Sequence, residues 1–446
     1  MSPRLIYAIV FIEGFCSLGA EVIALRRLVP HVGSAIVVTA PTIGFFLLAL
    51  ALGYAAGGRI ADDYRRVVRN NFLLAAALAG IGLSGPAIDL AFAHLQPAPI
   101  AYLAFVGGVM CPIAWLLGQT VPVLTNLLAS ERVGEASGNA LYWSTLGSFL
   151  GSLGLSLGMM QWLGVSSAVF VCGLGLAAGA LLLAGRDGKF WLLAGLTVAA
   201  SLAVNLQHAV NADTAYAEYR VTTVDLPGQQ NPRAFKVNQS VASLLDDSEP
   251  PRTTRYVEHL RRVLRDELGF REREILVLGA GGFTLSLADP DNRYTYVDID
   301  PTIRDIAERD FLKRPAGGEF IVDDARRFVA ASERRFDAVV VDVYSSHTSI
   351  PSHLVTQEFW AGLRRVLRDG HGVVLANLIL DGKLETPLAR NLLATIESVY
   401  GRCAVEVLHK GKPLANVEVL CFASSQPAAT GIYRDELNRA DSDRLR

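Results

Sequence analysis

Glycines and acids stand at the ends of strand-like stretches in the C-terminal half of the chain. The apolar stretch 274–278 runs directly into the turn Gly279-Ala280-Gly281-Gly282. Three further strand-like stretches each end in acids, which are Asp298, Asp323, Asp324 and Asp342. In open sheets of parallel strands, ligands bind beyond the carboxyl ends of the strands. We therefore expect the turn and these four acids to line one crevice.

The order of these groups indicates a nucleoside site. An acid about 20 residues after a glycine turn can accept hydrogen bonds from ribose hydroxyls, and an acid after the third strand can accept one from an adenine amino group. Position 284 is Thr, so the turn lacks the complete G-x-G-x-x-G pattern of dinucleotide binders. A nucleoside without a pyrophosphate, such as S-adenosylmethionine or a derivative, fits better. The alternative is a sheet of the same kind that binds no ligand.

Strands and helices alternate along this half of the chain. A helix is expected near 253–268, and strands are expected at 274–278, 294–300, 319–324, 336–342, 372–378, 404–408 and 418–422. This alternation predicts a doubly wound parallel sheet, hence an α/β, Rossmann-like domain. Two alternating stretches upstream, 215–224 and 233–242, predict a small β-ribbon that precedes the sheet.

The N-terminal half is apolar. Asp, Glu, Lys, Arg and His are absent from the stretches 32–58, 95–130, 136–185 and 190–207. About 20 apolar residues suffice to cross the hydrocarbon of a bilayer, so we expect seven spans, at 5–25, 35–57, 72–93, 100–127, 139–161, 164–185 and 190–207. The predicted domains are a multi-pass α-helical membrane bundle (1–208), a linker with the β-ribbon (209–252), the nucleoside-binding domain (253–425) and a polar, disordered tail (426–446).

Positive charges are unevenly distributed between the expected loops. The odd-numbered loops carry Arg26 and Arg27. The N-terminus and the even-numbered loops carry a larger set, Arg4, Arg59, Arg65, Arg66, Arg69, Arg132, Arg186 and Lys189. Because Lys and Arg concentrate on the cytoplasmic side, this bias places the N-terminus inside and, with seven spans, the C-terminal domain outside. A domain that uses a cytosolic nucleoside belongs inside, so against this bias we expect a bacterial inner-membrane protein with a cytoplasmic domain.

Two acids lie inside the first expected span. Glu13 and Glu21 share one face of a helix with Ser17, which lies one turn from each. Ionisable groups at membrane depth are costly and commonly functional, which suggests a cation or amine site. In the structural alternative, Glu13 is hydrogen-bonded within the bundle and Glu21 pairs with Arg26 or Arg27.

Charge and cysteine spacing argue against other classes of site. A net charge of −2 gives no basic excess for nucleic acid. The five cysteines, Cys16, Cys111, Cys172, Cys403 and Cys421, are scattered without metal-ligand spacing. We therefore expect neither a disulfide framework nor a zinc or other metal site.

With its ribbon, glycine turn and acids, the segment 214–425 resembles the aminopropyltransferases, that is, spermidine synthase and its relatives. The resemblance implies a β-ribbon followed by a class I methyltransferase-like sheet. The whole chain resembles a bacterial membrane subgroup of that family, in which the same domain follows transmembrane helices. The resemblance implies decarboxylated S-adenosylmethionine as co-substrate, an amine as acceptor, and no metal.

The resemblance also implies roles for single residues. On the donor side, it assigns donor contacts to Gln239, the ribose to Asp298 and the adenine to Asp324. On the acceptor side, it places Tyr256 near the amine and makes Asp342 the base that takes the proton from the attacking amine.

Two positions depart from the family pattern. Gly282 stands where the family has an Asp that holds the donor's aminopropyl nitrogen, and Ser345 stands where it has a second acceptor-site Asp. Buried cations need paired charge, so both losses weaken the case for plain putrescine. Gly282 also removes a charge that would repel the carboxylate of S-adenosylmethionine itself.

Three hypotheses about function remain open. The first is a membrane-bound aminopropyltransferase acting on an amine or amine-bearing amphiphile, with Asp342 as base and Tyr344, His347 and His353 available to shape the acceptor site. The second is a transferase that moves a methyl or aminocarboxypropyl group from S-adenosylmethionine. The third is a transporter or sensor whose nucleoside domain is not catalytic, with Glu13 and Glu21 at a translocation site. We expect the bilayer and a small amine as partners and leave homo-oligomerisation open.

Overall fold

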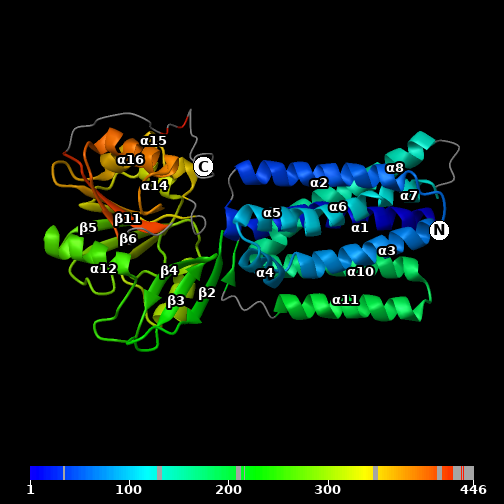
Figure 1. Cartoon of the computed structure of the whole chain (residues 1–446), viewed down its shortest axis with the longest axis horizontal. Coiled ribbons are helices and arrows are strands. Elements are labelled where there is room, and N and C mark those ends of the chain that lie inside the picture. Colours follow the sequence, from blue (N-terminus) through cyan, green and yellow to red (C-terminus); the bar gives the residue numbers. More distant parts are fainter. Residues whose placement is uncertain are drawn as a thin grey trace. The chain divides into compact units, whose positions relative to one another are not determined.

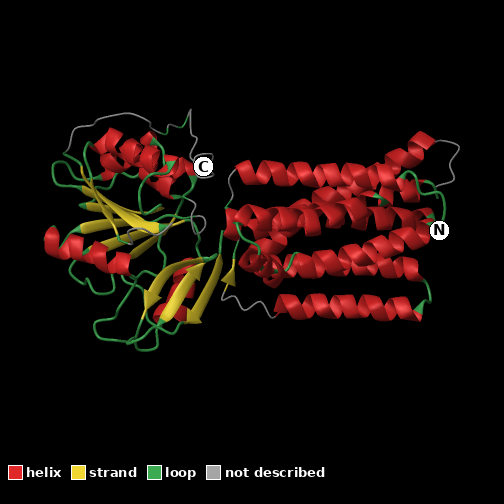
Figure 2. Ribbon diagram, viewed as in Figure 1, coloured by secondary structure: helices red, strands yellow, loops and turns green. Residues whose placement is uncertain are grey.

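The helices of the N-terminal half and the strands of the C-terminal half form two units in the computed structural model (Figure 1). The structure describes all residues except 34–35, 128–132, 207–211, 215, 345–349, 409–413, 425–432, 434 and 436–446. The first unit consists of residues 1–34, 38–209 and 213–215, and the second of 35–37, 210–212 and 216–446. The first unit is helical, whereas the second contains a seven-stranded sheet (Figure 2).

The first unit is built from long apolar helices, several of which continue through π-helical turns. The helices are α1 (Pro3–Val32), α2 (Ile36–Gly57), α3 (Tyr64–Ala77), α4 (Gly85–His94), α5 (Ala98–Phe105), α6 (Cys111–Gly118), α7 (Thr120–Thr125), α8 (Val133–Leu153), α9 (Gln161–Leu163), α10 (Val165–Ala184) and α11 (Gly188–Leu206). The π-helical turns are Leu78–Gly82, Val106–Met110 and Gly154–Met160.

Most of the expected membrane spans coincide with these helices. Five segments are long and apolar enough to cross a bilayer, namely Pro3–Val32, Ile36–Gly57, Ala98–Thr125, Val165–Ala184 and Gly188–Leu206. The pair Tyr64–Gly82 and Gly85–His94, bent by 69°, would make a sixth. The expected span 139–161 falls on α8 and the turn after it, and it is not among them because α8 is rich in Gly, Ser and other polar residues.

Helices α1 and α8 nevertheless lie side by side in backbone contact. A Cβ atom on Gly147 would lie 2.2 Å from the carbonyl oxygen of Phe11, and one on Gly151 would lie 2.1 Å from that of Phe15. Residue numbers rise together along the two helices, so they run parallel. Small residues allow such close approach where no hydrophobic drive exists between helices. Helix α8 therefore extends beside a helix that is itself a candidate span.

The sheet of the second unit has the strand order β10-β11-β9-β8-β5-β6-β7. Its strands are β5 (Glu274–Leu278), β6 (Arg293–Asp298), β7 (Glu319–Val322), β8 (Ala338–Val341), β9 (Val373–Leu380), β10 (Ala404–Val407) and β11 (Ala415–Phe422). Strands β5 to β9 pair in parallel, which confirms the Rossmann-like class. The expectation of a parallel sheet is wrong at one edge, where β11 is antiparallel to both β9 and β10. Strands β10 and β11 are separated by only residues 408–414, and a connection this short permits only antiparallel pairing of the two.

Alternate residues of the central strands enter two different cores. Leu276 and Val339 belong to one hydrophobic cluster, and Ile275 and Val340 belong to the other. This double burial is why these strands are apolar throughout. The helices of the unit are α12 (Arg255–Arg262), α13 (Ile303–Ile306), α14 (Ala325–Ala331), α15 (Gln357–Val366) and α16 (Pro387–Tyr400).

The β-ribbon contains one more turn than expected. Its antiparallel strands are β2 (Glu218–Thr223), β3 (Arg233–Val237) and β4 (Ser240–Leu245), and the two-residue strand β1 (Ala212–Asp213) precedes them. The stretch 233–242, predicted as one strand, is a hairpin that reverses at Asn238, where φ is 56°. Asn tolerates this left-handed conformation, and its place at the turn explains the break.

The expectation that the chain has no disulfide is wrong, because the second unit contains one. Cys403 and Cys421 form a disulfide with sulfur atoms 2.08 Å apart. Ala404 pairs with Leu420 across β10 and β11, so the next pair outward brings the two cysteines together. Sequence spacing could not show this, because the pairing depends on the strand register. The three cysteines of the bundle are free.

Part of the tail predicted to be disordered is packed. Tyr433 is 2% exposed. Its backbone nitrogen donates to Thr395 Oγ1 at 2.8 Å, and its carbonyl oxygen accepts from the Gln357 nitrogen at 2.8 Å. The large ring of Tyr433 can be buried against α15 and α16, so the expectation of disorder is wrong at this residue.

We predict that Gly151→Ala destabilises the protein, because its methyl group would overlap the Phe15 carbonyl oxygen. A forced backbone shift of this kind costs about 1–3 kcal/mol. The matched control is Gly154→Ala, one turn further along, where an added Cβ has nothing within 4 Å. Thermal unfolding of the purified protein in detergent measures both. Equal unfolding midpoints for the two variants would contradict the close contact of α1 and α8.

Candidate active site

The side chain of Asp342, directly after β8, is held by two neutral donors. Tyr256 on α12 donates to Asp342 Oδ2 at 2.9 Å, and Asn377 Nδ2 on β9 donates to Oδ1 at 2.8 Å. Burial raises the pKa of Asp342, and these two hydrogen bonds oppose the rise. A carboxylate whose pKa is raised by desolvation is a stronger base, so Asp342 is suited to accept a proton.

A second set of hydrogen bonds fixes Asn377. The hydroxyl of Tyr344 donates to the Asn377 carbonyl oxygen at 2.6 Å and accepts from the Ile379 nitrogen at 2.8 Å. Asn416 Nδ2 on β11 donates to Asn377 Oδ1 at 2.9 Å. The sequence analysis missed both asparagines, although a buried Asn within the apolar stretch of β9 was a usable signal. Tyr344 is thus turned toward β9 and positions Asn377.

The phenols of Tyr256 and Tyr344 both stay neutral. Burial, followed by the nearby charge of Asp342, raises the pKa of each phenol well above its usual value. The Tyr256 hydroxyl also lies 2.8 Å from the Ala242 carbonyl oxygen on β4. Tyr256 therefore stays a neutral donor that links the ribbon to the base.

The glycine turn passes directly beside Asp342. Gly279 has φ of 89°, and a Cβ there would lie 2.2 Å from the Asp342 carbonyl oxygen, so both the conformation and the space require glycine. The Ala280 nitrogen donates to Asp298 Oδ2 at 2.9 Å, and the Asp300 nitrogen donates to Oδ1 at 3.0 Å. The predicted ribose-binding acid thus lies against the turn, and burial raises its pKa.

Gly282 lies in a crowded place. A Cβ there would lie 2.5 Å from Phe311 Cε1 and 2.8 Å from Ser243 Cβ. The Gly282 nitrogen also donates to Ser243 Oγ at 3.0 Å. A side chain at this position would therefore meet the β-ribbon and Phe311, so the missing acid is accompanied by a local packing that leaves it no room.

A small cavity of about 20 Å³ lies under the turn. It is lined by Ser243, Tyr256, Val257, Leu260, Val277, Gly279, Ala280, Gly281, Thr284, Leu285, Tyr296, Val340 and Asp342. That volume holds about one water molecule. A nucleoside would therefore lie over the strand ends rather than inside this cavity.

Other predicted residues lie outside this cluster. Asp324 caps α14, accepting from the Arg327 nitrogen at 2.9 Å, and its other oxygen lies 3.3 Å from His353 Nε2. Asp323 pairs with the Arg327 side chain, while its own nitrogen donates to the Asp298 carbonyl oxygen at 3.0 Å. Gln239 is exposed on the turn between β3 and β4. Ser345 and His347 lie outside the described residues.

A buried carboxylate–histidine cluster near Asp342 was not anticipated. His259, one turn after Tyr256 on α12, contacts Glu418 Oε2 through Nδ1 and lies 3.1 Å from Glu406 Oε2 through Nε2. Glu418 pairs with Asn377 across β11 and β9 and is 6% exposed. Burial raises the pKa of Glu418 to about 7, against the opposing effect of His259. The signal in sequence was a Glu inside an apolar strand.

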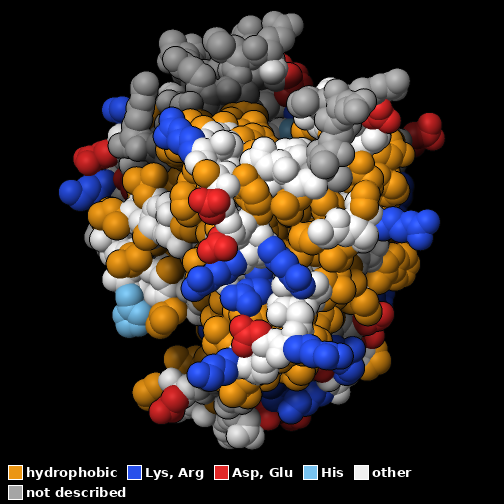
Figure 3. Space-filling view, turned by 90° about the vertical axis from the view of Figure 1, so that its right-hand side faces the viewer, with side chains coloured by type: hydrophobic (Ala, Val, Ile, Leu, Met, Phe, Trp, Pro, Cys, Tyr) orange, Lys and Arg blue, Asp and Glu red, His pale blue; other side chains and the backbone are white. Residues whose placement is uncertain are grey.

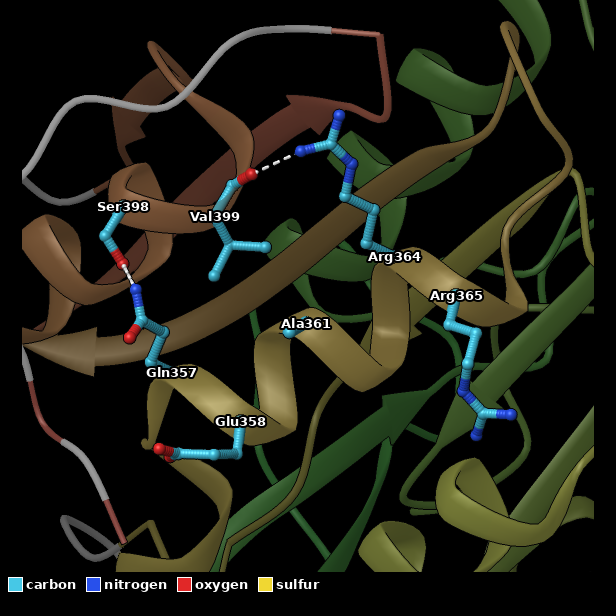
Figure 4. A pocket seen from close by; sticks show the side chains of 7 residues that line it. All are labelled: Gln357, Glu358, Ala361, Arg364, Arg365, Ser398 and Val399. Atoms are coloured by element: carbon cyan, nitrogen blue, oxygen red, sulfur yellow. Dashed lines mark hydrogen bonds between the residues drawn. The ribbon is translucent and has the colours of Figure 1, made fainter. Parts of the chain in front are cut away.

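A larger hollow of about 550 Å³ lies between α15 and α16 (Figure 4). Its polar side chains already serve the fold, since Gln357 Nε2 donates to Ser398 Oγ at 2.9 Å and Arg364 Nη1 donates to the Val399 carbonyl oxygen at 2.6 Å. None of the predicted site residues lines it. The strand ends therefore remain the better candidate site.

The acids of the bundle are buried. Glu13 is 1% exposed and accepts a hydrogen bond from Ser144 Oγ on α8 at 2.8 Å, while Glu21 is 7% exposed. Arg26 and Arg27 both lie near Asp213, at 3.8 and 3.9 Å. The hydrogen bond to Ser144 matches the structural alternative for Glu13. Within the described residues, no group of three or more His, Cys, Asp or Glu side chains could hold a metal.

We predict a pH-dependent stability that arises from Glu418. Its pKa is about 7 in the folded protein and 4.5 as the ordinary value, so the folded state binds its proton more tightly and this stabilisation is lost as pH rises through 7. The full effect is about 3 kcal/mol. In urea unfolding of the full-length protein between pH 5 and 8, Glu418→Gln removes this slope. The control Glu406→Gln removes the exposed partner of His259 and should retain the slope. An unchanged slope in Glu418→Gln would contradict the assignment of this pH dependence to Glu418.

Comparisons with known sequences find polyamine aminopropyltransferases. No family model matches the chain. A polyamine aminopropyltransferase of Vibrio vulnificus is 28% identical over 198 residues, covering 42% of this chain and 57% of that protein. A polyamine aminopropyltransferase of Mycobacterium tuberculosis is 26% identical over 390 residues, covering 80% of this chain and 73% of that protein. This chain thus spans little more than half of the Vibrio relative's length.

A solved structure adds a weaker likeness. A probable spermidine synthase of Corynebacterium glutamicum is 21% identical and aligns with a TM-score of 0.39 over 46% of this chain and 77% of that one. The mycobacterial match covers 80% of this chain, which is more than residues 209–446 contain, so it includes part of the helical bundle. These sequence matches confirm the resemblance to the polyamine aminopropyltransferases, the spermidine synthase family.

Proposed function

We propose that the protein is a membrane-bound transferase that moves an aminopropyl group from decarboxylated S-adenosylmethionine to an amine acceptor. The acceptor is a small amine or an amine-bearing amphiphile near the bilayer. Asp342 acts as the base, Tyr256 holds it in place, and Asp298 holds the ribose. The named activity of the relatives supports this choice of donor and acceptor.

The observation that carries the proposal is the position of Asp342. Its carboxylate is half-buried, accepts hydrogen bonds from the neutral side chains of Tyr256 and Asn377, and lies beside the glycine turn. Neutral donors orient the carboxylate without neutralising it, so it can attract an amine and accept its proton.

The proposed step balances with these groups. The nitrogen of a neutral amine attacks the donor's propyl carbon that is bonded to the sulfonium, and a carbon–nitrogen bond forms. The carbon–sulfur bond breaks, and its electron pair neutralises the sulfur to a thioether. The new ammonium gives one proton to Asp342, which later releases it to solvent. The protein contributes alignment of the two reactants and the proton acceptor.

A second candidate is transfer of a methyl or aminocarboxypropyl group from S-adenosylmethionine. The crowding at Gly282 favours it, because an acid that would grip the donor's ammonium and repel a carboxylate has no space there. The same base and the same edge of the sheet would serve this reaction. The identity of the transferred group therefore depends on which nucleoside the site prefers.

We predict that Asp342→Asn lowers the turnover number by about 10²–10⁴ while nucleoside binding is retained, because a general base contributes about that much. Product formation by the full-length protein, with decarboxylated S-adenosylmethionine and a set of diamines, measures turnover, and calorimetry measures binding. Asp369→Asn, an exposed acid on a turn of the same unit, is the control. Full turnover in Asp342→Asn would remove the catalytic assignment, and binding without turnover in the parent would favour a sensor.

A further inference from the structure

Contacts along the helices fix the direction of each one in the bundle. Helix α10 runs opposite to α1, because a Cβ on Gly179 would lie 3.5 Å from Ile12 near the start of α1, while Ser166 accepts a hydrogen bond from Arg27 near its end. Helix α8 runs parallel to α1. Helix α10 is therefore antiparallel to both α1 and α8.

The last helix of the bundle runs in the same direction as the first. Helix α3 is opposite to α10, since Gly80 lies against Gly173 and Phe72 against Gly179. Helix α11 is parallel to α3, since Arg69 pairs with Asp187 just before α11 at 3.3 Å, and Gly80 lies against Ser201. Helix α11 therefore ends at the opposite end of the bundle from the N-terminus.

The chain is anchored where it leaves the bundle. Asp213 Oδ2 accepts a hydrogen bond from the Val165 nitrogen at 2.9 Å, at the start of α10. The same carboxylate lies 3.8 Å from Arg26 and 3.9 Å from Arg27, near the end of α1. The chain thus leaves the bundle at the end where α1 finishes, and the main segment of the α/β unit follows from residue 216.

The two ends of the bundle differ in charge. Arg26 and Arg27, at the end where the chain leaves the bundle, share Asp213. The N-terminal end carries a larger described set of cations, Arg4, Arg59, Arg65, Arg66, Arg69, Arg186 and Lys189. Figure 3, which faces the N-terminal end, shows Lys and Arg side chains gathered over it. Cations of this kind attract the anionic headgroups of the cytoplasmic leaflet.

The cysteines of the two units also differ in oxidation state. Both cysteines of the α/β unit, Cys403 and Cys421, are joined in a disulfide, while the three in the bundle are free. Disulfides persist in oxidising compartments, and the cytosol keeps thiols reduced. This observation is independent of the charge bias and points to the same side.

We propose that the basic N-terminal end of the bundle faces the cytoplasm and that the α/β unit lies on the opposite, extracytoplasmic side of the membrane. This reverses the orientation expected from the use of a cytosolic nucleoside. The inference does not depend on the transferase assignment. Where both hold, the amine acceptor is met outside the cytoplasm, and a donor nucleoside made inside must reach the site by a transport step.

Cysteine labelling of the full-length protein in a bacterial inner membrane tests the orientation. The reporters are Asp62→Cys, in the exposed loop after α2, and Glu333→Cys, in an exposed loop of the α/β unit. In intact spheroplasts, we expect a membrane-impermeant maleimide to label Glu333→Cys at least tenfold more than Asp62→Cys, and permeabilisation to equalise them. The parent protein reports background from its native cysteines.

Protection of Glu333→Cys together with labelling of Asp62→Cys would overturn the proposal, and so would labelling of both in intact spheroplasts.

A second measurement uses the unaltered protein. Cells are treated with a permeant thiol-blocking reagent before lysis, and Cys403 and Cys421 are then identified by mass spectrometry. We expect both to be unblocked and joined; blocked cysteines would show a reducing surrounding and contradict the proposal. Neither readout requires activity, so failure of the proposed function would be seen separately.

Discussion

The hydrogen bond between Tyr256 and Asp342 joins three parts of the chain at one point. Tyr256 is on α12, Asp342 ends β8, and the same phenol lies beside the Ala242 carbonyl oxygen on β4. The glycine turn must pass within contact distance of the Asp342 backbone, which only Gly279 permits. The ribbon, the turn and Asp342 are therefore positioned together, and a shift of any one would displace the others.

Neutral groups hold the carboxylate of Asp342 in this arrangement. Desolvation of a carboxylate costs free energy and raises its pKa. An Arg or Lys partner would offset that cost but would also lower the basicity of Asp342 and repel an ammonium. The described hydrogen bonds come instead from the Tyr256 phenol and the Asn377 amide. Asn377 is held in turn by Tyr344 and Asn416, so the geometry is fixed by neutral groups.

The parallel strands and the approach of the glycine turn to Asp342 could be predicted from the sequence, because local patterns decide them. Apolar runs punctuated by Gly279, Asp298 and Asp342 predicted the parallel strands and the approach of turn and base. What the sequence analysis missed depended on register and tertiary contact. The disulfide of Cys403 and Cys421 follows from strand pairing, and no spacing rule reveals it.

The donor-side residues show the same limit. The resemblance assigns Asp324 to an adenine; in the structure its side chain caps α14 and contacts His353, and the assignment stays a prediction. Helix capping and ligand binding use the same residue type at a strand-to-helix junction. Asn377 and Glu418 were missed because each is a single polar residue inside an otherwise apolar strand. Their partners lie on other elements and are known only from the fold.

The central claim is that the strand ends bind an aminopropyl donor. Calorimetric titration of the full-length protein in detergent with decarboxylated S-adenosylmethionine, S-adenosylmethionine and methylthioadenosine tests it most directly. The account predicts that all three bind and that the decarboxylated donor binds at least tenfold more tightly than S-adenosylmethionine. Tighter binding of S-adenosylmethionine, or binding of none of the three, would contradict it.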